Sequence, residues 1–117
     1  MAITTVTLLP YTEYGVPSGN YDGSSLDFTG DPQKAANYYR GRGSIQTIRW
    51  VFRGVQGQVA IQATLDNDPA DSRWFEVATY GDSTDTYIQA VMGNFTWLRA
   101  VVTNFTDGTI EVVQATY

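Results

Sequence analysis

The sequence predicts an all-β fold, an antiparallel β-sandwich of seven or eight short strands with a jelly-roll-like or Ig-like arrangement. Aromatic residues make up 14% of the chain and accompany many Thr, Val and Ile residues, which are enriched in strands. Alternating apolar and polar runs recur roughly every ten residues, and clusters of Gly, Asn, Asp and Pro separate them. The 117 residues fit one domain, spanning residues 1–117.

The clearest strand signal lies in the middle of the chain. Residues 45–53 alternate with a period of two, which is typical of a half-buried strand. A second run at 58–65 alternates in the same way, and a link with a glycine at each end, residues 54–57, predicts a β-hairpin between the two runs. In the first run Ile48, Trp50 and Phe52 share one face of a half-buried strand. In the second run the residues expected to face inward are Val59, Ile61, Ala63 and Leu65.

Strands are also expected on both sides of this hairpin. The first covers residues 2–9 and ends at Pro10. The later ones are expected at 74–80, 87–92, 95–103 and 109–117, each bounded by turn residues. No run has the length and period of a three-turn helix.

A long polar loop or arm occupies about residues 10–33. It is rich in Gly, Pro, Asn, Asp and Ser, although a short strand could form at 26–28. Segments of this length without secondary structure are uncommon in compact domains, and they usually serve as functional loops or interaction arms, or are disordered. We therefore expect this arm to contact a neighbouring subunit.

Composition excludes several kinds of chemistry. The chain has no Cys and no His, so disulfides, thiolate metal sites and a Ser-His-Asp triad cannot form. Its net charge of −5 disfavours nucleic acid and anionic membrane surfaces as partners. The N-terminus does not resemble a signal peptide, and no apolar run is long enough to span a membrane. We expect a protein that is not an enzyme.

Two groups of acidic residues are considered as candidate functional sites. Asp66, Asp68 and Asp71 share one turn and could hold calcium, but the pattern of an EF-hand loop is not met. Glu76 and Glu111 lie in predicted strands, where solvation or pairing with Arg is the usual role. We therefore expect no metal and no cofactor.

Aromatic and basic side chains are the candidates for a protein interface. Tyrosines in or beside the long arm could anchor a partner, and two arginines flanking Gly41 could pair with a neighbour's carboxylates. These candidate residues are Tyr11, Tyr14, Tyr21, Tyr38, Tyr39, Arg40 and Arg42. The three tryptophans, Trp50, Trp74 and Trp97, fall in predicted strands and are expected mainly in the core.

Six motifs and the terminal residue stand out along the chain: residues 6–10 (VTLLP), 38–43 (YYRGRG), 63–66 (ATLD), 74–77 (WFEV), 93–100 (GNFTWLRA) and 106–110 (TDGTI), with Tyr117. Together they resemble the small virion structural proteins of tailed phages, especially those that infect cyanobacteria. The likeness covers most of the chain and follows the pattern of its strands, without any catalytic signature.

The resemblance implies a part of a phage particle, assembled in the host cytoplasm: capsid decoration or cement, neck, tail, baseplate or fibre attachment. The implied partners are other virion proteins and copies of the chain itself. A carbohydrate-binding module or receptor-binding tip is the alternative, because exposed Tyr and Trp rings can also stack on sugars. A host-surface glycan is then the partner.

Overall fold

The computed structural model describes residues 4–36, 38, 45–70 and 73–117, and it confirms an all-β fold. The described residues form no helix, and their strands pair only in the antiparallel sense. In chain order the strands are β1 (Thr5–Leu9), β2 (Thr12–Glu13), β3 (Phe28–Thr29), β4 (Gln33–Lys34), β5 (Ile45–Thr64), β6 (Phe75–Ser83), β7 (Thr86–Met92) and β8 (Trp97–Thr116).

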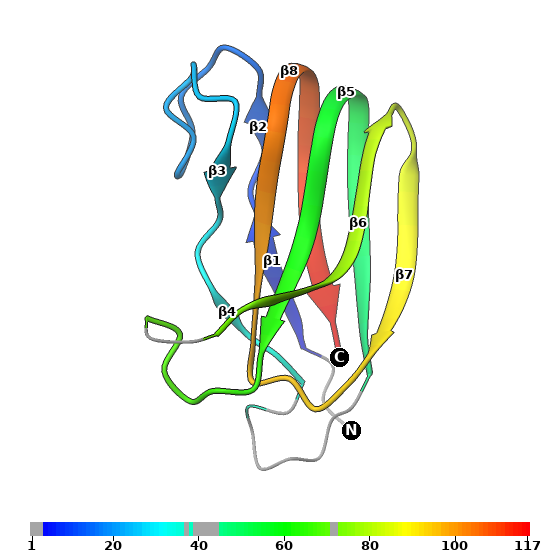
Figure 1. The fold of residues 1–117 in the computed structure, drawn as a ribbon. Helices are drawn as coiled ribbons and strands as arrows, with labels where there is room; N and C mark the ends of the chain where they lie inside the picture. The colour runs from blue at the N-terminus through cyan, green and yellow to red at the C-terminus, as the bar shows by residue number, and fades with distance from the viewer. Residues whose placement is uncertain (1–3, 37, 39–44, 71–72) are drawn as a thin grey trace.

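Two long strands, β5 and β8, organise the molecule. Each has 20 residues and bends over at the upper end, so that its two arms lie in opposite layers (Figure 1). The first arm of β5, residues 45–53, pairs with the second arm of β8, residues 109–116. The second arm of β5, residues 58–64, pairs with the first arm of β8, residues 97–103.

The shorter strands complete the two layers. The back layer of Figure 1 has the order β1, second arm of β8, first arm of β5, β7. The front layer has the order β3 and β4, first arm of β8, second arm of β5, β6. The earlier arm of β5 thus pairs with the later arm of β8, and the later arm of β5 pairs with the earlier arm of β8. This is the pairing of a jelly roll, the first of the two arrangements that the sequence left open.

The predicted hairpin turn at residues 54–57 was wrong. This segment is the bend of β5, where Gly54 and Gly57 have positive φ angles of 63° and 142°. The bend of β8 lies directly against it, since a Cβ on Gly57 would be 2.8 Å from the carbonyl oxygen of Asn104. The two arms therefore separate into different layers instead of pairing with each other.

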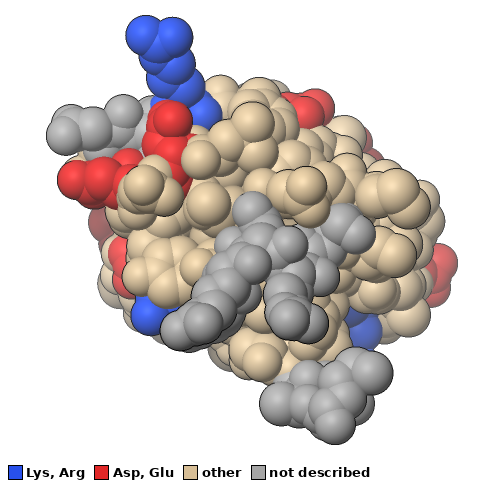
Figure 2. Space-filling model, turned by 90° about the horizontal axis from the view of Figure 1, so that it is seen from below, with Lys and Arg blue, Asp and Glu red and all other residues tan. Residues whose placement is uncertain are grey.

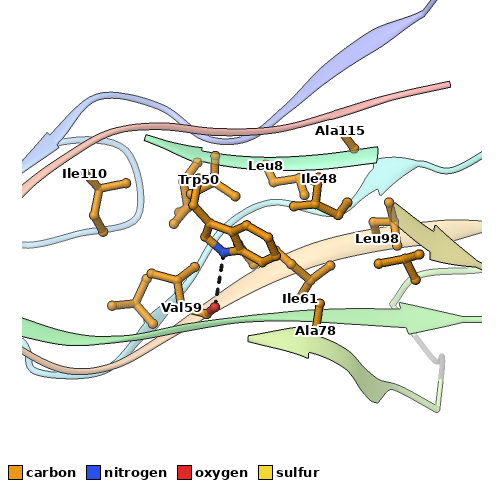
Figure 3. Packing of buried hydrophobic residues seen from close by; sticks show 14 of the residues in the cluster. Leu8, Ile48, Trp50, Val59, Ile61, Ala78, Leu98, Ile110 and Ala115 are labelled. Atoms are coloured by element: carbon orange, nitrogen blue, oxygen red, sulfur yellow. Dashed lines mark hydrogen bonds between the residues drawn. The ribbon is translucent and has the colours of Figure 1, made fainter. Parts of the chain in front are cut away.

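The core lies between the two layers and confirms most of the predicted inward faces. Trp50 is fully buried, and its ring lies among side chains from both layers (Figure 3). Leu65 was predicted to face inward but is 61% exposed, because β5 ends at Thr64. Buried residues of both long strands form the centre of the core: Ile48, Trp50, Phe52, Val55, Val59, Ile61, Ala63, Leu98, Ala100, Val102, Phe105, Ile110, Val113 and Ala115.

The arm at residues 10–33 is not a free loop. The short strands β2, β3 and β4 all pair with β8, so the arm follows β8 from its second arm to its first. Backbone hydrogen bonds join Tyr14 N–H to the Gly108 carbonyl and Gly30 N–H to the Ala100 carbonyl, at 3.0 and 2.8 Å. The short strand expected at 26–28 overlaps β3 only at Phe28, because β3 spans Phe28–Thr29.

Candidate interaction surfaces

Tyr21 anchors the arm from below. It is 1% exposed, and its ring packs on Phe28 and Phe105 with centroid distances of 4.9 and 5.3 Å. Its hydroxyl oxygen accepts a hydrogen bond from the Gly15 N–H at 3.0 Å. Because its side chain is buried, Tyr21 is not a candidate interface residue. Its ring instead attaches the turn-rich arm to the core.

Tyr14 is exposed but seated on the core. Its ring meets Phe105 edge to face, with a centroid distance of 5.7 Å and an interplanar angle of 88°. Leu26 lies beside the same residue, since its carbonyl oxygen accepts a hydrogen bond from the Phe105 N–H at 2.9 Å. The Val16 N–H donates a hydrogen bond to the Glu13 carbonyl oxygen at 3.1 Å and closes the turn that contains Tyr14. We call Tyr14, Val16 and Leu26 the arm tip; their exposed fractions lie between 44% and 49%.

Tyr11 lies three residues before the arm tip on the same segment and is 54% exposed. Its carbonyl oxygen accepts a hydrogen bond from the Ser18 hydroxyl at 2.9 Å. The arm therefore presents two of the predicted tyrosines, Tyr11 and Tyr14, on ordered backbone.

The upper end of the molecule is acidic. Glu13 and Asp27 flank the arm tip, and Asp107 lies in the bend of β8. Asp82 and Asp85 add to this end from the β6–β7 connection. Among the described residues of this end, the basic side chain is Arg53, and its Nη2 lies 2.5 Å from Glu111. The arm tip is thus an apolar patch with an acidic border.

Tyr38 lies at the opposite end. Its ring meets Trp97 at a centroid distance of 5.2 Å, and the Lys34 ammonium lies 4.6 Å from its ring centroid. Trp97 in turn donates from its indole nitrogen to the Asn67 carbonyl oxygen at 3.0 Å. Because Trp97 begins the first arm of β8 while Phe105 lies at its bend, the structure separates Tyr38 from Tyr11 and Tyr14. The candidate tyrosines that the structure describes therefore do not form one surface.

The lower end carries few charges over most of its described surface, and acidic side chains lie mainly at its margin (Figure 2). The predicted candidates Tyr39, Arg40 and Arg42 lie outside the described residues. Other exposed apolar side chains of this end are Ile45, Leu65, Phe75 and Met92.

A third cluster lies on the outer face of the front layer. The Arg99 guanidinium stacks over the Trp74 ring at 4.3 Å, and its Nε donates to the Gln62 side-chain oxygen at 2.8 Å. Burial lowers the pKa of Arg99 from its ordinary value. All three tryptophans were expected mainly in the core, and this is confirmed for Trp50. It was wrong for Trp74 and Trp97, which are half-buried on this face.

Two aspartates that follow β5, Asp66 and Asp68, accept hydrogen bonds from backbone N–H groups. Asp66 accepts from the Arg73 N–H at 2.8 Å, and Asp68 accepts from the Ala70 N–H at 2.9 Å. Asp71 lies outside the described residues. Within the described ranges, no group of three or more acidic side chains is placed to hold a metal ion. These bonds are the usual work of Asp in turns.

Sequence reasoning missed the exposed apolar residues along β7 and its neighbour. Ile88 and Met92 on β7 are 59% and 76% exposed, and Ile45 on β5 pairs directly with Met92. The signal was present in the sequence, because residues 86–92 contain no charged residue, no Gly and no Pro.

No family model matches the chain, and no curated protein matches it in sequence. In the part of the chain that the structure describes, no helix is long and apolar enough to cross a membrane.

Proposed function

We propose that this chain is a non-enzymatic structural component of a tailed-phage particle: a capsid decoration or cement protein, or a part of the neck, tail, baseplate or fibre attachment. It acts through protein–protein packing. The observation that carries the proposal is the arm tip, an exposed apolar patch fixed on the core by the contact between Tyr14 and Phe105.

The seating of the arm tip suits a binding role. An aromatic side chain that is already held in place loses little conformational freedom when a partner covers it. Tyrosine at the centre of a patch is also a frequent source of binding energy in interfaces. Since the backbone around Tyr14 is hydrogen-bonded to β8, the arm can present this residue in one conformation.

The acidic border defines the kind of partner. Glu13, Asp27 and Asp107 lie beside the apolar arm tip, so a complementary protein surface has an apolar centre with basic side chains next to it. Such a charge pattern speeds association and makes it sensitive to salt. The resemblance to virion structural proteins, carried by the motifs at 38–43 and 93–100, supports placing that partner in a phage particle.

Incorporation into particles tests this proposal. The chain is expressed with an affinity tag in infected host cells, and particles are purified by density gradient. Tyr14→Asp and Leu26→Asp are expected to lower incorporation at least tenfold, whereas Thr79→Asp, an exposed substitution on the outer face of β6, leaves it unchanged. Equal incorporation of all four chains contradicts a role of the arm tip. Absence of the unaltered chain from particles contradicts the proposal as a whole.

A carbohydrate-binding role is the second candidate, and the cluster of Trp74, Arg99 and Gln62 favours it. An aromatic ring beside planar polar side chains can stack on a sugar ring and hydrogen-bond its hydroxyl groups. A glycan array read with the native chain, Trp74→Ala and Tyr14→Ala separates the two functions. Binding lost only in Trp74→Ala supports this second role, and no binding across a broad array contradicts it.

A further inference from the structure

Strand β7 forms one edge of the back layer. In the described part of the chain its backbone pairs only with β5, through seven consecutive residue pairs from Thr86↔Val51 to Met92↔Ile45. The opposite side of β7 therefore presents unpaired N–H and C=O groups. An exposed strand edge of this length is a template for another strand.

The other edges carry features that discourage such pairing. On β6, Glu76 and Asp82 add charge, Asp82 has a φ of 50°, and the pairing with β5 shifts register between Ile61 and Gln62. Charges and bulges of this kind are the usual protection of edge strands.

The far side of the molecule is closed by the arm. Pairing of β1 shifts register between Thr7 and Leu9. Gly30 approaches β1 so closely that a Cβ there would be 2.4 Å from the Leu8 carbonyl oxygen. The two layers are thus joined on this side, and β7 is the long unprotected edge among the described strands.

We propose that β7 pairs with β7 of a second copy of this chain, antiparallel and about a two-fold axis at Gln89. The proposal deepens the assembly role proposed above by naming a partner, and it rests on a different surface from the arm tip. The two back layers then join into one continuous sheet.

The strand is complementary to itself in this register. Thr86 lies opposite Met92 of the second copy, Tyr87 opposite Val91, and Ile88 opposite Ala90. Aromatic with β-branched residues, and apolar residues with one another, are favourable cross-strand pairs. Gln89 meets its own copy, and two amide side chains can hydrogen-bond to each other. Seven residue pairs supply about six to eight backbone hydrogen bonds.

Charge selects this edge over the rest of the surface. The chain carries a net charge of −5, so two copies repel each other where acidic residues meet. β7 contains no charged residue, and in the proposed register Asp85 lies opposite Gly93 of the second copy. The outward neighbours Ile88, Met92 and Ile45 add exposed apolar area beside the seam.

Light scattering after size exclusion tests the pairing on the purified chain, from micromolar to millimolar concentration. We expect a dimer. We expect Ile88→Lys and Ala90→Lys each to raise the dissociation constant of this dimer at least tenfold. Thr7→Lys is the matched control, because Thr7 is exposed on the other edge strand of the same layer. A monomer at every concentration, or equal effects of Thr7→Lys and the β7 substitutions, overturns the proposal.

Cysteine cross-linking tests the register. The chain has no Cys, so a single introduced thiol reports on one position. Gln89→Cys is expected to form a disulfide dimer under mild oxidation. Thr86→Cys is not, because two copies of residue 86 would lie ~20 Å apart in this register. Equal cross-linking by both variants contradicts the register. If a β7 variant is monomeric yet still enters particles, it has lost only the pairing of β7. That result leaves the proposed function standing.

Discussion

The indole nitrogen of Trp50 donates a hydrogen bond to the carbonyl oxygen of Val59 at 3.3 Å, and this bond joins the two arms of β5 across the core (Figure 3). Trp50 lies in the back layer and Val59 in the front layer, nine residues later in the same strand. The bond therefore links the two arms of β5 inside the core.

Trp50→Phe tests the contribution of this residue to stability. The substitution removes the N–H donor and leaves a small cavity in a fully buried site. We expect the free energy of unfolding to fall by about 2–4 kcal/mol. Trp74→Phe is the matched control on the outer face, with an expected loss under about 1 kcal/mol. Chemical denaturation measures both, and equal losses would show that the bond across the bend is not a major contact.

The glycines of the bends predict a second contrast. Gly108 has a φ of 96°, and a Cβ there would be 2.2 Å from the Gly54 carbonyl oxygen. Gly108→Ala is therefore expected to cost roughly 3 kcal/mol or more. Gly54 also has a positive φ but has open space around it, so Gly54→Ala should cost only about 1–2 kcal/mol. Thermal unfolding of both variants checks this order, and the reverse order would contradict the packing of the two bends.

Tyr21 should control the order of the arm. Tyr21→Phe removes the acceptor for the Gly15 N–H and keeps the ring in the core, so we expect a loss of about 1 kcal/mol. Hydrogen exchange of the Gly15 amide should become faster than the loss of global stability explains. The exchange rates of the β5 amides should change only as much as global unfolding does. Tyr21→Ala should cost about 3–5 kcal/mol. Unchanged exchange at Gly15 in Tyr21→Phe would show that the hydroxyl does not hold the arm.

The turn after Asp22 should respond to acid. Hydrogen bonds from the Ser24 backbone, then from the Ser25 side chain and backbone, lower the pKa of Asp22 from 3.8 to about 2. The pKa of Asp22 is lower in the folded chain than in the unfolded chain. These bonds therefore stabilise the turn at pH values above the unfolded pKa, and they are lost as the pH falls towards the folded pKa. The amide signals of Ser24 and Ser25 should titrate together with a midpoint of about 2. A midpoint near the ordinary carboxyl value would contradict the turn geometry.

The alternation of residues was a sufficient guide to the buried faces of the strands. The inward positions Ile48, Trp50 and Phe52 could be predicted because a strand buried on one face repeats every two residues. The bend at residues 54–57 could not, since a link with a glycine at each end reads the same whether the arms pair with each other or enter opposite sheets. Only the contact of Gly57 with the bend of β8 decides between them.

The interface residues were harder to predict than the strands. Tyr14 and Tyr21 occur in the same turn-rich segment, but one is exposed and the other is buried. Both rings contact Phe105, but the ring of Tyr21 also packs on Phe28, and no local pattern reveals these long-range contacts. The uncharged run at 86–92 was visible in the sequence, but its place at a sheet edge followed only from the pairing of β7 with β5.

If the chain is a structural part of a phage particle, it must be present in particles purified from the source that encodes it. Quantitative mass spectrometry gives the number of copies of this chain relative to the major capsid protein. We expect many copies in a fixed ratio that survives a density gradient. Absence from intact particles, with the chain found only in the surrounding lysate, would contradict it.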